Sequence, residues 1–82
     1  MRTIHKYPIR ATIEMPIGAK IIKVDTQGNE GMFWAEVDTS MPYEQRYFDV
    51  IGTGWEVPTG LTYIGSYLQE MYVWHIYERF YE

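Results

Sequence analysis

Residues 19–38 have the sequence AKIIKVDTQGNEGMFWAEVD, and the pattern is that of an antiparallel β-hairpin. In the first half, Ile22 and Val24 alternate with the charged Lys23 and Asp25. A period of two between apolar and polar residues is typical of a strand that buries one face. We therefore predict that Ile22 and Val24 face the core.

The second half of this segment has the same period. Residues 32–38 place Phe33, Ala35 and Val37 on one face of a strand. Between the two halves, residues 27–31 contain two glycines and an asparagine, which tolerate the positive φ angles that hairpin loops need. The segment predicts two paired strands joined by a loop.

Five further strands are predicted on either side of this hairpin, at residues 3–7, 11–15, 45–51, 61–68 and 71–80. Frequent Gly and Pro residues leave few stretches long enough for a helix. We expect an all-β fold, a small antiparallel sandwich or open barrel of about six or seven short strands, with residues 1–82 forming one domain. Residues 71–80 are apolar on both faces, which predicts either a central strand or one that meets another subunit.

The composition indicates how so short a chain is stabilised. The chain has 82 residues, no cysteine and fourteen aromatic residues, counted as eight Tyr, three Trp and three Phe. Disulfides are excluded, so aromatic packing and oligomerisation are the remaining ways to stabilise the fold. We expect a homo-oligomer.

The charge excludes some partners. The formal net charge is −4, so binding to a nucleic-acid backbone is not expected. The sequence has no apolar run of the roughly 18 residues that span a bilayer, and residues 1–8 lack the apolar centre of a signal peptide. We expect no membrane contact and a cytoplasmic location.

Metal binding and acid–base chemistry have few candidates. The two histidines, His5 and His75, are far apart in sequence, and a metal site would need a third ligand such as Glu36 or Asp49. An ordinary histidine bonded to backbone or water is the simpler interpretation. We expect no metal and no cofactor.

Nucleophilic catalysis has little support in the sequence. Neither Ser40 nor Ser66 lies in a Gly-x-Ser-x-Gly turn. Acidic residues that could form a catalytic pair are present, but any acidic β-protein offers such pairs by chance; they are Glu36, Asp38, Asp49 and Glu56. We predict that the protein is not an enzyme, with no catalytic residues.

The segment Gly52-Thr53-Gly54-Trp55 is the most distinctive local motif. Glycine amides can approach an anion, and Trp55 can stack on a base, with Arg46 available to hold phosphate. A plain tight turn is the alternative, because the P-loop and dinucleotide fingerprints are absent.

The last strand and its neighbour carry rings suited to an interface. Tyr and Trp are enriched at the energetic centres of protein interfaces. The candidate interface residues are Tyr47, Tyr72, Trp74, His75 and Tyr77.

Six sequence blocks carry a resemblance to a known group of proteins. They are TIHKYP (3–8), IEMPIGAKI (13–21), FWAEVD (33–38), IGTG (51–54), YIGS (63–66) and VWHIYE (73–78). In this order they resemble a family of short, uncharacterised bacteriophage and prophage proteins. The resemblance covers nearly the whole chain and assigns no functional residues.

The resemblance implies two hypotheses about function. The first is a non-enzymatic phage protein in the host cytoplasm that inhibits a bacterial defence component. It would either sequester a signalling nucleotide or block the surface of a host protein. The second is a structural or accessory phage module that binds itself or another phage protein. A third hypothesis, a hydrolase that acts on a nucleotide signal, rests only on His5, His75 and scattered carboxylates.

Overall fold

The computed structural model describes residues 1–81 and contains seven β-strands. They are β1 (Arg2–Pro8), β2 (Thr12–Pro16), β3 (Lys20–Gln27), β4 (Glu30–Asp38), β5 (Tyr43–Gly52), β6 (Leu61–Gln69) and β7 (Tyr72–Arg79). The all-β prediction is confirmed, and each predicted strand is present within a few residues of its expected bounds. Among the described residues, no helix is long and apolar enough to cross a membrane.

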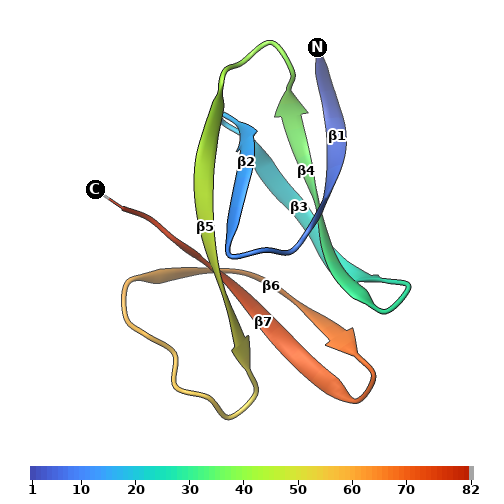
Figure 1. Cartoon of the computed structure of the whole chain (residues 1–82), viewed down its shortest axis with the longest axis vertical. Helices are drawn as coiled ribbons and strands as arrows, with labels where there is room; N and C mark the ends of the chain where they lie inside the picture. Colours follow the sequence, from blue (N-terminus) through green and yellow to red (C-terminus); the bar gives the residue numbers. More distant parts are fainter. Residues whose placement is uncertain (82) are drawn as a thin grey trace.

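The strands form two antiparallel sheets that pack as a sandwich (Figure 1). One sheet has three strands in the order β1-β4-β3, and the other has four in the order β2-β5-β7-β6. Of the two alternatives predicted for the last strand, the central position is the one observed, because β7 lies between β5 and β6. The sheets approach each other most closely where β3 lies along β6.

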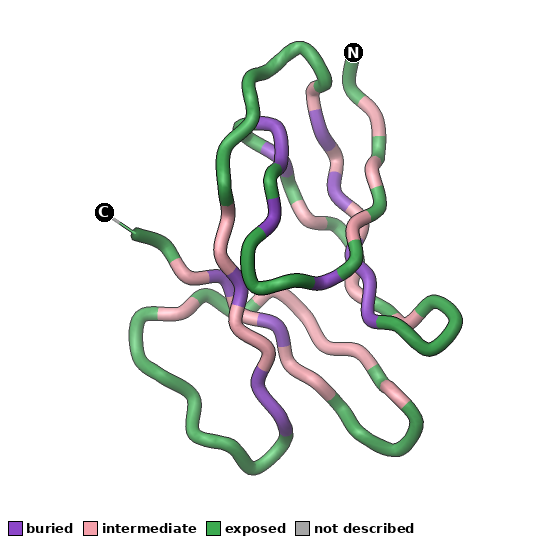
Figure 2. The backbone as a smooth tube through the Cα atoms, in the orientation of Figure 1, coloured by how far each residue is buried: buried purple, intermediate pink, exposed green. Residues whose placement is uncertain are grey.

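The core lies between the two sheets, and most of the buried segments lie in the upper and middle parts of the view in Figure 2. Phe33 of β4 and Phe48 of β5 pack with ring centroids 5.2 Å apart. Tyr7 of β1 adds a third ring 5.7 Å from Phe33. The predicted alternation along β4 is confirmed, since Phe33, Ala35 and Val37, which were expected to share one face, are all buried.

One predicted face is wrong. Ile22 is 47% exposed, whereas Ile21 and Val24 pack against the core. The pairing of β3 with β4 shifts register between Ile21 and Lys23, which is a β-bulge. An extra residue in one strand breaks the period of two, so the side chain of Ile22 turns to the outside.

A buried ion pair fixes the four-stranded sheet. Arg46 of β5 donates from Nε to Glu78 Oε2 at 2.6 Å and from Nη2 to Oε1 at 2.7 Å, with Glu78 only 2% exposed. A third donor, Nη1, bonds the backbone oxygen of Ala19 at 2.6 Å, in the connection between β2 and β3. Hydrogen bonding to Glu78 raises the pKa of Arg46 against the opposing effect of burial. The pair joins β5, β7 and the chain that crosses to the other sheet.

Removing one partner of this pair should destabilise the fold strongly. We expect Arg46→Met to lower the free energy of unfolding by about 3–5 kcal/mol, because Glu78 then stays buried without a counter-ion. Urea denaturation measures this. The matched control is Arg79→Met, whose partner Asp49 is partly exposed rather than buried, and it should cost less than about 1 kcal/mol. Equal effects of the two variants would contradict the account.

Tyr7 provides a second test, in alkaline solution. Its hydroxyl is buried and has no hydrogen-bond partner among the described residues, and burial, followed by the charge of Tyr43, raises its pKa above 10.0. A raised folded-state pKa gives stability that is complete below the unfolded pKa and is lost as the pH rises through the folded one. We expect Tyr7→Phe to raise the free energy of unfolding by about 1 kcal/mol at pH 7 and to lose less than the wild type between pH 9 and 11. A variant less stable than the wild type at pH 7 would show that the hydroxyl is satisfied.

Candidate functional site

The Gly-Thr-Gly-Trp motif forms a tight turn at the end of β5. The Trp55 amide donates to the Gly52 carbonyl oxygen at 3.0 Å, and Gly54, third in the turn, has φ of 89°. This is the arrangement of a type II turn, which needs glycine at its third position. The turn brings the indole of Trp55 onto Gly52, where an added Cβ would lie 2.8 Å from Trp55 Cε2. Gly54 therefore allows the turn, and Gly52 leaves room for the indole of Trp55.

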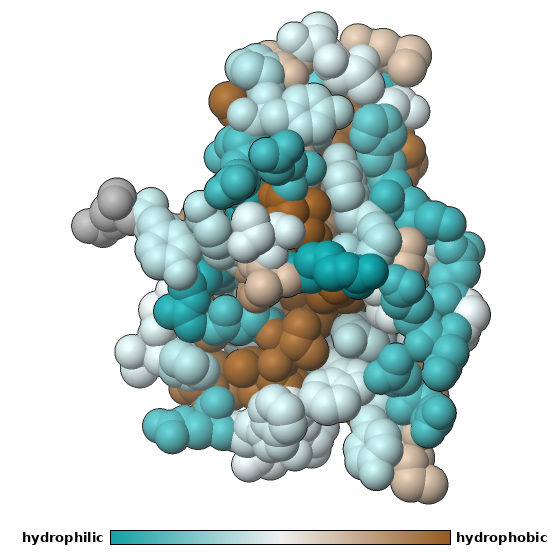
Figure 3. All heavy atoms as spheres, in the orientation of Figure 1, coloured by the Kyte–Doolittle hydropathy of each residue, from teal (hydrophilic) through white to brown (hydrophobic). Residues whose placement is uncertain are grey.

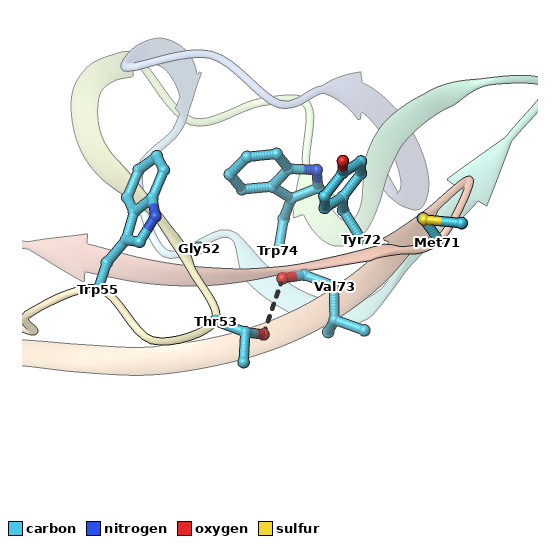
Figure 4. Close-up of a pocket in the computed structure, with 7 residues that line it drawn as sticks. All are labelled: Gly52, Thr53, Trp55, Met71, Tyr72, Val73 and Trp74. Atoms are coloured by element: carbon cyan, nitrogen blue, oxygen red, sulfur yellow. Dashed lines mark hydrogen bonds between the residues drawn. The ribbon is translucent and has the colours of Figure 1, made fainter.

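Trp55 meets two rings of β7. Trp55 and Trp74 have centroids 5.6 Å apart and planes inclined at 78°, and Tyr72 and Trp74 have centroids 6.4 Å apart. The three rings stand on the same side of the strand in Figure 4, while the side chains of Thr53 and Val73 point to the other side. This side is the inner face of the sheet, because Trp74 and Tyr72 precede the buried Ile76 by two and four residues.

The inner face is open here because the three-stranded sheet does not cover it. Trp55 is 59% exposed and Tyr72 is 61% exposed. In Figure 1 the end of β5 and the start of β7 project away from β1, β3 and β4. Met71, at the start of the open end, is also exposed. The half-covered sandwich leaves a row of rings at the surface.

These residues line a groove of about 520 Å³, which we call the aromatic groove. Its lining consists of Gly52, Thr53, Trp55, Met71, Tyr72, Val73 and Trp74, and none of these side chains carries a formal charge. Rings of this kind look pale in Figure 3, because Trp and Tyr have intermediate hydropathy. The groove can hold a flat or apolar group of moderate size.

The predicted ligand-binding residues do not all meet. Gly52, Thr53 and Trp55 line the groove, with Gly54 beside them in the turn. Arg46 lies apart from them, with its guanidinium held by Glu78 and Ala19. Because its guanidinium is bonded inside the fold, Arg46 supplies no phosphate contact to the groove.

The predicted interface residues divide between the two faces of the sheet. Tyr72 and Trp74 lie in the groove, whereas Tyr47, His75 and Tyr77 alternate onto the outer face. Tyr77 packs edge-on against Tyr63 at 5.4 Å, and Tyr47 packs against Tyr81 at 4.7 Å. The period of two separates residues that the sequence placed in a single group.

On the outer face, His75 is the centre of a hydrogen-bonded chain. Ser66 Oγ lies 2.9 Å from His75 Nδ1 and 2.6 Å from the hydroxyl of Tyr63. On the other side of the ring, Thr53 Oγ1 lies 3.0 Å from His75 Nε2 and donates to the Val73 carbonyl oxygen at 3.2 Å. This row of hydrogen bonds crosses β6, β7 and the turn after β5, and it gives His75 a structural partner at each ring nitrogen.

The donors in this chain determine the tautomer of neutral His75. Thr53 has one hydroxyl proton and gives it to Val73, so it accepts from Nε2–H. Nδ1 then accepts from Ser66, which accepts from Tyr63. The other histidine, His5, lies on β1 of the opposite sheet, next to Tyr7. Among residues 1–81, no group of three His, Cys, Asp or Glu side chains is arranged to hold a metal ion.

Two of the residues that line the groove were not predicted as site residues. Met71 and Val73 belong to the last predicted strand, but nothing in their residue type marks them as exposed. The signal that could have found the groove is the spacing of Tyr72 and Trp74 on the face of Ile76, combined with a glycine turn that carries a third ring. That combination places three rings at the end of one sheet.

Fold and groove together define a small, two-sheet antiparallel β-sandwich with an exposed aromatic surface. The chain belongs to the family described as Domain of unknown function (DUF7352), whose model matches residues 1–82. No curated protein and no solved structure matches the chain.

The hydrogen-bonded chain predicts the proton position on His75. We expect neutral His75 to carry its proton on Nε2, and long-range proton–nitrogen spectra at pH 8 distinguish this from the Nδ1 form. In Thr53→Val the acceptor for Nε2–H is lost, so the nitrogen shifts of His75 should change, whereas those of His5 should not. A neutral ring with its proton on Nδ1 would contradict the assigned directions.

Proposed function

We propose that this protein is a non-enzymatic binding protein that recognises a protein partner through the aromatic groove. The observation that carries the proposal is the open inner face, where Trp55 and Tyr72 are more than half exposed around Trp74. A buried aromatic side chain contributes much contact area and loses little conformational entropy when it binds. Rings that serve only the core would be covered.

The groove favours a protein over a signalling nucleotide. A nucleotide needs a ring for the base and cations or amides for the phosphates. The rings are present, but the lining residues carry no charge. The two arginines of the four-stranded sheet, Arg46 and Arg79, are already paired with Glu78 and Asp49. Sequestration of a nucleotide therefore has weaker support than binding to a protein surface.

The resemblance to phage proteins supports a narrower form of the proposal. In that form the partner is a component of bacterial anti-phage defence in the host cytoplasm, and binding inhibits it. The alternative is an accessory phage module that assembles with itself or with another phage protein. In each case the groove is the surface that makes contact.

Capture from a bacterial lysate tests the proposal. We expect tagged wild-type protein to enrich a specific host protein about tenfold or more over the double variant Trp55→Ala/Tyr72→Ala, because truncating hot-spot rings costs about 2 kcal/mol or more each. The matched control, Ile4→Ala/Ile22→Ala, removes exposed apolar side chains from the other sheet and should keep the partner. Quantitative mass spectrometry measures the enrichment.

Three results would contradict the proposal. The first is enrichment that the groove variants do not change. The second is a rise in melting temperature with a nucleotide, since a ligand at a hundred times its Kd stabilises the folded state by about 2.7 kcal/mol. The third is a stable oligomer in light scattering that the Trp55→Ala/Tyr72→Ala variant dissociates, which would favour self-assembly.

A further inference from the structure

The chemistry around the groove indicates which group of a partner it takes. Two acidic residues flank the lining in sequence: Glu56 follows Trp55, and Glu70 precedes Met71. Both are exposed, and neither forms an ion pair among the described residues. The seven lining residues supply no cation to balance these carboxylates. The groove thus has an uncharged aromatic lining, with one exposed carboxylate next in sequence at each end of it.

A lining of rings with these two carboxylates beside it in sequence suits a cation. The face of an aromatic ring is the negative end of its quadrupole and attracts a cation within about 6 Å, with Trp the strongest. The inclined planes of Trp55 and Trp74 and the nearby ring of Tyr72 present several faces to one volume (Figure 4). The protein already makes such a contact elsewhere, where Lys23 Nζ lies 5.9 Å from the centroid of Trp34.

We propose that the aromatic groove binds an arginine side chain of the partner protein, held against the row of rings formed by Trp55, Trp74 and Tyr72 and attracted by Glu56 and Glu70. Arginine fits better than lysine, because its planar guanidinium stacks on rings and is more weakly hydrated than an ammonium group. The volume of about 520 Å³ also has room for apolar neighbours of that arginine in the segment. This inference rests on the proposed function and specifies the group that is recognised.

Nuclear magnetic resonance tests this with three natural reporters. The three tryptophans give three indole N–H signals, of which Trp55 and Trp74 lie in the groove and Trp34 lies on the other sheet. The probe is a short peptide with a central arginine between leucines, compared with the same peptide carrying citrulline, which has nearly the same shape without the charge. We expect the arginine peptide to shift the Trp55 and Trp74 signals at about five- to tenfold lower concentration than the citrulline peptide, and to leave Trp34 unchanged.

Two variants separate the contributions of the rings and the carboxylates. Trp55→Leu keeps an apolar side chain but removes the ring face, so it should abolish the preference for arginine, whereas Trp34→Leu should keep it. Glu56→Gln/Glu70→Gln keeps all the rings and should reduce the preference and its dependence on salt. Far-UV circular dichroism confirms that each variant is folded.

The outcomes distinguish this inference from the proposed function. Equal or tighter binding of the citrulline peptide at Trp55 and Trp74 would overturn the arginine inference and leave a protein-binding groove in place. The same holds if arginine binding shifts Trp34 instead. If the groove variants also leave capture of the host partner unchanged, the proposed function itself fails.

Discussion

The buried pair of Arg46 and Glu78 is the constraint on which the rest of the structure depends. Two charges that are this little exposed to solvent are tolerated only when each is hydrogen-bonded, and here the carboxylate accepts two hydrogen bonds from the guanidinium. This requirement fixes β7 against β5 in one register, with Phe48 opposite Glu78 and Gly52 opposite Trp74. A shift by one residue would move Trp74 and Tyr72 to the outer face of the sheet. The groove therefore exists because the ion pair sets the register several residues away.

The unequal sheets explain why rings remain exposed. Three strands cover part of the inner face of four, so the rings divide between two tasks: Tyr7, Phe33 and Phe48 fill the covered half, while Trp55 and Tyr72 stay at the surface of the uncovered half. The outer face is different again, because its polar chain through Ser66, His75 and Thr53 satisfies its own donors and acceptors. Thr53 belongs to both regions, since it is part of the groove lining while its side chain points to the outer face and bonds His75. The groove and the hydrogen-bonded network of the outer face therefore share this residue.

The sequence predicted the fold well and the site only in part. Period-two patterns and glycine punctuation located all seven strands, and the two apolar faces of residues 71–80 gave the central position of β7 as one of two alternatives. The predicted orientation of Ile22 was wrong, because no sequence pattern marks the β-bulge in β3. The Gly-Thr-Gly-Trp motif was predicted as part of a candidate site, and three of its residues line the groove. Arg46 could not be separated from it, since its partner Glu78 is 32 residues away and becomes a neighbour only through the pairing of β5 with β7. Which rings are covered depends on how far one sheet extends over the other, and that is a property of the packed sheets.

Hydrogen exchange of the chain bound to its captured partner tests the central claim most directly. The account predicts that slowed exchange is confined to the turn at residues 52–57 and the segment at residues 70–74, which surround the aromatic groove. Amides of β1 and β4, and those of β6 beside Ser66, the partner of His75, should exchange as they do in the free protein. Protection centred on β1 and β4 with none at residues 52–57 would contradict the account, because the partner would then occupy the three-stranded sheet and the exposed rings would have no part in binding.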